Sequence, residues 1–225
     1  MNSILTSRWT KVPVFLLCLV PLGMLVLLGV RGNPTFAINP KEFVEHWTGD
    51  WTIRFLIITL AITPLRKTLK LPQLIRFRRM LGLFAFFYGC LHFTTWLWLD
   101  RYFNWPEMVK DIAKRPFITV GFAGFVLMIP LAVTSTAGWI RRLGGRRWQG
   151  LHRAIYLSAI AGVIHYYWLV KSDVRKPLQY AAVVAVLLAW RIAYWVINRR
   201  SGTPASGAIR SEEPATAETM LREPG

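Results

Sequence analysis

The sequence predicts an all-α membrane protein, a polytopic bundle of six transmembrane helices. Of its 225 residues, 54% are hydrophobic. These residues gather in separate runs of about 17–21, the helix length that crosses a hydrocarbon core of roughly 30 Å. Basic residues cluster in the short segments between the runs, as in proteins whose loops set the membrane topology. We therefore expect one membrane domain within the lipid bilayer, covering residues 1–200.

The expected spans cover residues 12–30, 43–65, 80–99, 117–137, 151–170 and 177–197. The first run has basic flanks, and no convincing small-residue cleavage site follows it. We therefore expect a retained helix rather than a signal peptide. After Arg200 the sequence becomes polar and rich in Pro, Gly, Ala and Glu, so residues 201–225 are expected to form a disordered tail.

The charges between the spans predict the orientation. Two loops, between spans two and three and between spans four and five, contain many bases and no acid. Every acidic residue before the tail lies on the opposite side of the expected bundle. Because loops rich in Lys and Arg stay in the cytoplasm, both basic loops and both termini are expected to be cytoplasmic.

The net charge of +17 would suggest nucleic-acid binding in a soluble protein. Here the bases flank apolar runs, which favours topology control and contact with anionic lipid headgroups. No aromatic-basic groove or zinc pattern is present, so no nucleic-acid partner is expected. Cys18 and Cys90 lie in different expected helices, which argues against a disulfide or an iron–sulfur site.

Three of the four histidines are expected in the third and fifth spans. An ionisable side chain inside a span is costly and usually functional. Counted from the basic side at about 1.5 Å per residue, His92 lies roughly 18 Å and His165 roughly 21 Å along its helix. The two imidazoles are therefore nearly level, as bis-histidine ligation of a heme iron requires. His152 is expected near the inner surface, level with Arg78 and Arg79, which cannot ligate iron.

Two glycines support the heme interpretation. Gly89 and Gly162 each precede a level histidine by three positions and share its helix face. A glycine there leaves space for the edge of a flat macrocycle, whereas the alternative is that small residues only let helices pack closely. His46, at the outer start of the second span, is expected to be an interfacial polar residue rather than a ligand.

Basic residues suggest two further contacts. Arg54 lies inside the second span, where a buried guanidinium needs an anion. A heme propionate is a candidate partner, and snorkelling to the outer surface is the alternative. A basic cluster at the inner surface could hold a flavin phosphate or contact only lipid headgroups; it comprises Arg78, Arg79, Arg147, His152 and Arg153.

Several segments closely resemble the MsrQ family, also called YedZ. They are ITPLR (62–66), IRFRRMLGL (75–83), LHFTTW (91–96), RPFITVGF (115–122), LAVTST (131–136), RRWQGLHRAIYL (146–157) and IHYYWLVK (164–171). In order, they cover most of the second to fifth spans, whereas the first span, the sixth span and the tail are similar only in hydropathy and position. The family belongs to a superfamily of ferric reductase-like transmembrane domains.

The resemblance implies a multi-pass protein of the bacterial cell inner membrane that binds heme b and FMN. It also implies a partner, MsrP, a periplasmic molybdenum-cofactor enzyme that reduces oxidised methionines. The electrons would come from a cytosolic flavin reductase or from membrane quinol. His92, His152 and His165 match the family's ligand histidines. Two-heme relatives carry a further histidine where this chain has Arg78 and Arg79, so one outer heme on His92 and His165 is favoured over two, with flavin near His152.

The expected activity is electron transfer across the membrane by a subunit of a methionine sulfoxide reductase system. No GxGxxG fingerprint for a dinucleotide is present, so an external donor is expected. One alternative is a quinol-oxidising cytochrome b that serves another periplasmic acceptor. The other is a proton-coupled transporter with histidines as relay sites, although such proteins usually show internal repeats and none is convincing here.

Overall fold

The structure is a computed structural model that describes residues 8–201. In this range it contains helices and no strand. The helices are α2 (Lys11–Val30), α3 (Pro34–Ile38), α4 (Pro40–Thr68), α5 (Ile75–Thr95), α6 (Trp105–Lys114), α7 (Pro116–Val133), α8 (Ala137–Leu143), α9 (Gly145–Leu151), α10 (Ala154–Leu169) and α11 (Arg175–Ser201), with 3-10 turns at Arg8–Thr10 and Pro72–Leu74 and a π-helical turn at Trp96–Asp100. The prediction of an all-α fold is confirmed. The predicted tail, residues 201–225, lies outside the described residues except for Ser201, which is the last residue of α11.

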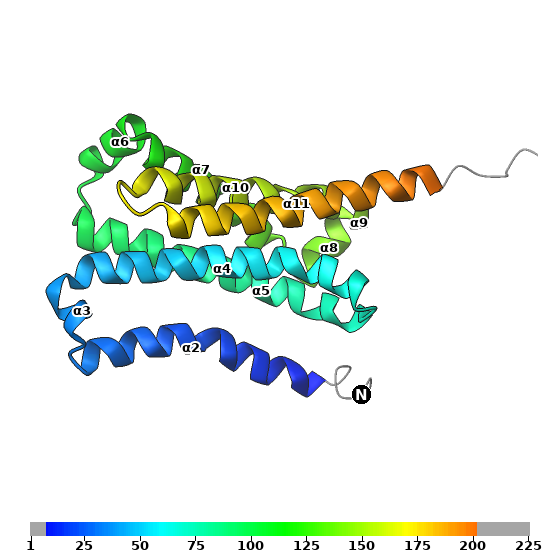
Figure 1. Cartoon of the computed structure of the whole chain (residues 1–225), viewed down its shortest axis with the longest axis horizontal. Helices are drawn as coiled ribbons and strands as arrows, with labels where there is room; N and C mark the ends of the chain where they lie inside the picture. Colours follow the sequence, from blue (N-terminus) through cyan, green and yellow to red (C-terminus); the bar gives the residue numbers. More distant parts are fainter. Residues whose placement is uncertain (1–7, 202–225) are drawn as a thin grey trace, which may run out of the picture. The chain divides into compact units, whose positions relative to one another are not determined.

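A helix occupies each of the six places where a span was predicted (Figure 1). Within residues 8–201, four stretches are long and apolar enough to cross a membrane: Lys11–Val30, Pro72–Asp100, Pro116–Val133 and Arg175–Arg199. Helix α4 is more polar because it contains Asp50 and Arg54, and α10 has only 16 residues, about 24 Å of helix. The chain is a multi-pass membrane protein, while the count of six spans and the cytoplasmic termini stay predictions.

The chain forms two compact units, one through Ala189 and one from Trp190. In the second unit, Trp190 stacks on Tyr194 with ring centres 5.2 Å apart, and the guanidinium of Arg199 lies 4.1 Å from the ring centre of Trp195. All of the residues that form the candidate site belong to the first unit.

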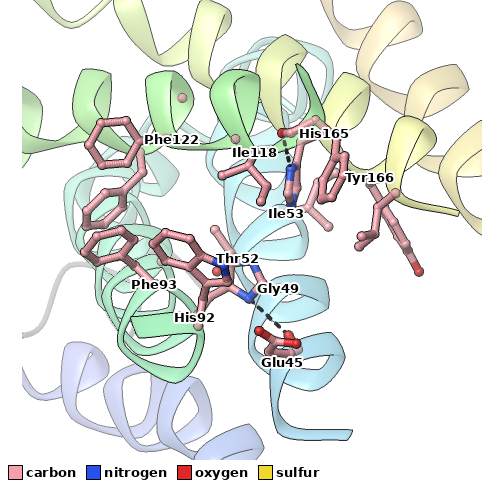
Figure 2. A pocket seen from close by; sticks show the side chains of 18 of the residues that line it. Glu45, Gly49, Thr52, Ile53, His92, Phe93, Ile118, Phe122, His165 and Tyr166 are labelled. Carbon is pink, nitrogen blue, oxygen red and sulfur yellow. Dashed lines mark hydrogen bonds between the residues drawn. The ribbon is translucent and has the colours of Figure 1, made fainter. Parts of the chain in front are cut away.

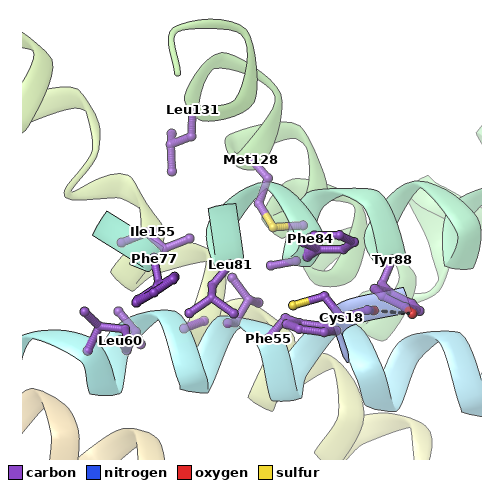
Figure 3. Close-up of a cluster of buried hydrophobic side chains, with 14 of the residues drawn as sticks. Cys18, Phe55, Leu60, Phe77, Leu81, Phe84, Tyr88, Met128, Leu131 and Ile155 are labelled. Atoms are coloured by element: carbon purple, nitrogen blue, oxygen red, sulfur yellow. Dashed lines mark hydrogen bonds between the residues drawn. The ribbon is translucent and has the colours of Figure 1, made fainter. Parts of the chain in front are cut away.

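Two helix pairs build the first unit. Helix α4 packs along α5, and α7 packs along α10. Their facing side chains form an apolar core (Figure 3) in which the ring of Phe55 stacks on those of Phe84 and Tyr88, with centres 5.8 and 5.2 Å away. Tyr88 and Leu60 in this core are fully buried. The packing fixes α5 against α4 and α10 against α7, which are the helices that carry the candidate ligands and their supports.

A buried tyrosine attaches α2 to this core at a proline. Pro21 lies inside α2 and has no backbone N–H. Next to it, the Tyr88 hydroxyl accepts a hydrogen bond from Leu22 N (3.1 Å) and donates one to Cys18 O (2.9 Å), as Figure 3 shows for the second bond. Trp47 Nε1 donates to Pro21 O at 3.0 Å. Backbone groups of α2 at the proline are thus satisfied by side chains of α4 and α5.

The loops differ most from the prediction. Helix α5 begins at Ile75, so Arg76, Arg78 and Arg79 lie on its first turns rather than in a loop. The chain between the third and fourth spans forms the amphipathic helix α6, whose buried residues are Met108 and Asp111. Such short helices were not predicted, because the apolar runs that identify spans carry no information about them.

Candidate functional site

A cavity of about 310 Å³ lies among α4, α5, α7 and α10 (Figure 2). Both level histidines line it, His92 from α5 and His165 from α10. Most of its lining is apolar, with charged residues where α4 begins and where α5 and α6 are joined. Its volume falls within the usual range of roughly 300–1,000 Å³ for cofactor and ligand sites.

The imidazoles of His92 and His165 meet in this cavity. Their ring centres are 6.1 Å apart, and the ring planes make an angle of 72°. Two imidazoles that share one iron, with metal–nitrogen distances of about 2 Å, have ring centres about 6–6.5 Å apart. The structure therefore brings together the two residues that the sequence predicts at one level, at a separation at which both could bind one metal.

Backbone carbonyl groups orient both rings. Nδ1 of His92 lies 3.1 Å from the carbonyl oxygen of Glu45 in α4, and Nδ1 of His165 lies 2.7 Å from that of Phe117 in α7 (Figure 2). A carbonyl oxygen only accepts, so Nδ1 donates and Nε2 keeps its lone pair. This is the usual second contact of a metal-bound histidine, where it fixes both the tautomer and the ring orientation.

Two glycines on the neighbouring helices make room for the rings. A Cβ atom at Gly49 of α4 would lie 3.1 Å from Cε1 of His92, and one at Gly121 of α7 would lie 2.5 Å from Nδ1 of His165. Both glycines therefore permit the close approach that the carbonyl hydrogen bonds require. Sequence reasoning missed them because the signal is a glycine level with a histidine on a different helix, which appears only once the helices are paired.

Gly89 and Gly162, the glycines predicted to leave space for a macrocycle, also line the cavity. A Cβ atom at Gly162 would meet no heavy atom within 4 Å, whereas one at Gly89 would lie 3.0 Å from Cε of Met128. Gly162 thus borders open space of the cavity, and Gly89 serves the packing of α5 on α7 as well.

The residues fit a heme better than a free metal ion. Among residues 8–201, no group of three or more His, Cys, Asp and Glu side chains is arranged to hold a metal ion, and a bare ion usually needs three or four such ligands. A porphyrin supplies the remaining ligands itself, so a pair of imidazoles is sufficient. Three phenylalanines give this cavity an apolar wall: Phe93 stacks on Phe125 with ring centres 5.0 Å apart, and Phe122 is tilted against Phe93 with ring centres 5.9 Å apart.

Charged residues form one end of the cavity lining. Asp100, Arg101 and Arg115 belong to it. Lys41 of α4 bonds to Asp100, which raises the pKa of this lysine. Arg101 pairs with Asp111 of α6, and Arg115 Nε lies 3.2 Å from the other carboxylate oxygen of Asp111. These ion pairs connect α4, the segment after α5, α6 and the start of α7 at this part of the cavity lining.

Arg54 lies outside this cavity lining. Its Nε donates to the Tyr180 hydroxyl at 2.9 Å, its Nη2 lies 3.6 Å from Asp50 Oδ2, and its guanidinium lies 4.8 Å from the ring centre of Trp51. Asp50 does line the cavity. The predicted propionate contact of Arg54 stays a prediction. His46, a neighbour of Glu45, lines the cavity but is exposed and lies 3.6 Å from Glu42.

His152 lies apart from this cavity, in the turn between α9 and α10. Its ring stacks on that of Trp148 at 3.9 Å, Nδ1 is 3.1 Å from Trp148 O, and Nε2 is 3.4 Å from Ser135 Oγ. Arg78 lies within electrostatic reach of His152. The prediction that His152 and Arg78 lie near each other, away from the histidine pair, agrees with this placement.

Arg79 and the other bases of the inner cluster, Arg147 and Arg153, are exposed. Exposed guanidinium groups could hold a phosphate or lipid headgroups. Neither their own geometry nor that of Arg78 separates these two roles, so the cofactor-binding role of Arg78 and Arg79 stays a prediction.

The sequence was compared with known protein families and proteins. Residues 48–163 match the family described as ferric reductase like transmembrane component. A protein of Herminiimonas arsenicoxydans is 53% identical over 193 residues, 85% of this chain and 87% of the relative. A protein of Ralstonia nicotianae is 54% identical over 205 residues (90% and 93%), and one of Bordetella pertussis is 48% identical over 184 residues (81% and 88%). All three are named protein-methionine-sulfoxide reductase heme-binding subunit MsrQ.

No solved structure matches the chain significantly. The identities near 50% cover most of both chains, and the matched family segment includes the whole of α5 and most of α10. The chain therefore belongs to the MsrQ family of ferric reductase-like membrane proteins.

Proposed function

We propose that this chain binds one heme b between His92 and His165 and passes single electrons across the bacterial inner membrane to a periplasmic methionine sulfoxide reductase of the MsrP type. The observation that supports this most is the histidine pair itself, with ring centres 6.1 Å apart in a cavity. The names of the MsrQ relatives include heme binding and methionine sulfoxide reductase, which agrees with this assignment.

Each residue of the site has a physical task in this proposal. Glu45 O and Phe117 O accept from the two Nδ1 atoms and so hold both Nε2 lone pairs toward the cavity. The phenylalanine wall excludes water and keeps the local dielectric low, which is one determinant of the potential of a bound cofactor. When bound, a heme supplies one-electron chemistry at its iron. None of the side chains needs to act as an acid or base.

We further propose that the electrons enter at the inner surface, near the cluster that contains Arg78, Arg79 and His152. A flavin phosphate would find exposed guanidinium groups there. FMN bound there would be reduced by a cytosolic flavin reductase and would pass electrons to the outer heme. Alternatively, membrane quinol would be the source of these electrons. A second heme on His152 is less well supported, because both ring nitrogens of His152 already have protein partners.

Electron delivery tests the function directly. Full-length protein in liposomes, supplied with a donor outside and MsrP with methionine sulfoxide at the opposite face, should sustain sulfoxide reduction. His92→Ala should abolish it, while His46→Ala, which removes a neighbouring exposed histidine, should not. A protein that is reduced by the donor but does not pass electrons to MsrP would favour the alternative of a cytochrome b for another periplasmic acceptor. A colourless preparation would favour a transporter.

A further inference from the structure

We propose that Arg115 binds a carboxylate of the cavity's ligand, and that Asp111 holds it in position to do so. The inference rests on the proposed heme, whose two propionates are the carboxylates in question. It concerns a residue at the junction of α6 and α7, where it is the N-cap residue of α7. Nothing in the pattern of spans or histidines points to this arginine, and only the folded arrangement places it at the cavity.

Arg115 is the arginine of the cavity lining that combines an exposed side chain with a single ion-pair partner. Its Nε lies 3.2 Å from Asp111 Oδ1, and within residues 8–201 its side chain has no other ion pair or hydrogen bond. A guanidinium presents five N–H donors in a planar fork. The contact with Asp111 occupies one of its nitrogens, so both Nη groups remain for a carboxylate, which is the partner that a bidentate fork matches best.

Arg101, the other arginine of the lining, already has three acidic neighbours, although its buried Nε forms no hydrogen bond within the described residues. Its Nε lies 3.1 Å from Asp100 Oδ2, its Nη1 lies 3.9 Å from Glu107, and its Nη2 contacts Asp111. Its side chain is only 16% exposed, against 51% for Arg115. Arg101 therefore holds the loop together, whereas Arg115 offers an unpaired edge to a ligand.

Acids at the same end would repel a propionate if they were uncompensated, but each has a basic neighbour. Asp100 pairs with Lys41 and Arg101, and Asp111 lies between Arg101 and Arg115. Glu45 is within electrostatic reach of Lys41 and Arg101.

Farther along α4, Asp50 pairs with Arg54 and lies within electrostatic reach of Tyr166. Arg54 itself is not part of the cavity lining, and its guanidinium contacts Asp50 and Tyr180. Arg115 is left as the base whose charge can serve an incoming carboxylate.

A comparison of two porphyrins tests the inference. Full-length protein is produced in heme-deficient cells, purified in detergent and titrated with iron protoporphyrin IX and with its dimethyl ester, which lacks the charged carboxylates. The wild type should bind the free acid at least about tenfold more tightly than the ester, as one charge-assisted contact provides. Arg115→Gln should lose most of this preference with little change in its affinity for the ester. Arg115→Lys, which keeps the charge without the fork, should fall between the two.

Lys114→Gln is the matched control, because it removes an adjacent exposed base that does not line the cavity, and it should keep the wild-type preference. An unchanged preference in Arg115→Gln, or equal losses for both porphyrins, would overturn the inference. So would a preference lost in Arg54→Gln but kept in Arg115→Gln. In each of these cases the proposed function would stand, because the wild type still binds heme. If the wild type bound neither porphyrin, the proposed function would fail as well.

Discussion

His92 and His165 face each other from α5 and α10, with ring centres 6.1 Å apart, and each donates from Nδ1 to a backbone carbonyl of the helix beside it. The two histidines are 73 positions apart in the chain. The carbonyl groups that accept from them, those of Glu45 and Phe117, lie near the starts of α4 and α7. The pair therefore depends on the packing of four helices rather than on any local motif.

Removal of either paired histidine should remove the heme. His92→Ala and His165→Ala would each remove one of the two ligands, so we expect heme to bind at least about tenfold more weakly and to be largely lost during purification, because loss of one strong contact costs more than about 1.4 kcal/mol. The pyridine hemochrome of purified protein measures this. His46→Ala is the control, and it should keep its heme. Full heme content in either paired variant would contradict the assignment.

His152→Ala should separate flavin from heme. His152 lies away from the histidine cavity and beside Arg78, so its loss should lower the FMN content while the Soret absorbance stays near that of the wild type. Flavin fluorescence after denaturation and the Soret band report the two contents on one sample. Equal loss of heme in His152→Ala and His92→Ala would rule out this division of roles.

Gly121→Ala should disturb the site through protein contacts alone. Its Cβ would lie 2.5 Å from Nδ1 of His165, where the hydrogen bond to Phe117 O is made, so the ring must move. We expect lower heme content and a lower melting temperature, with destabilisation of about 1–3 kcal/mol as is usual for overpacking. Gly23→Ala, whose Cβ would meet nothing within 4 Å, should show neither effect in thermal denaturation followed by tryptophan fluorescence.

Gly162→Ala should act only through the ligand. A Cβ there meets no protein atom within 4 Å but points into cavity space, so a methyl group would compete with a bound macrocycle. We expect weaker heme binding, whereas the heme-free protein should be as stable as the wild type or slightly more stable, since alanine favours a helix over glycine by about 1 kcal/mol. Unchanged heme affinity would mean that the macrocycle does not approach α10 at this position.

Tyr88→Phe should loosen α2 without changing the heme. The hydroxyl bridges Leu22 N and Cys18 O beside Pro21, and its loss should cost about 1 kcal/mol of stability. The helix can restore part of this by pairing the two backbone groups directly. A lowered melting temperature with an unchanged Soret band would agree with this role. A lost Soret band would show instead that α2 shapes the site.

The sequence predicted the parts of the fold that depend on length, apolarity and charge. Within the described residues a helix lies at each of the six apolar runs, and His92 and His165 meet in the cavity after being predicted at similar depths along their helices. The roles of Gly49 and Gly121 could not be predicted from the sequence, since they depend on which helix lies opposite each histidine. The sequence also could not separate Arg54 from Arg115, because a charge inside or beside an expected span has many possible partners. Only tertiary structure shows that Arg54 pairs with Asp50 and Tyr180.

The coordination of the iron tests the central claim most directly. Electron paramagnetic resonance of the purified ferric protein should show a low-spin signal typical of two imidazole ligands, and it should be lost in both His92→Ala and His165→Ala. A high-spin ferric signal in the wild type, or a low-spin signal that survives either substitution, would contradict ligation of one iron by these two histidines.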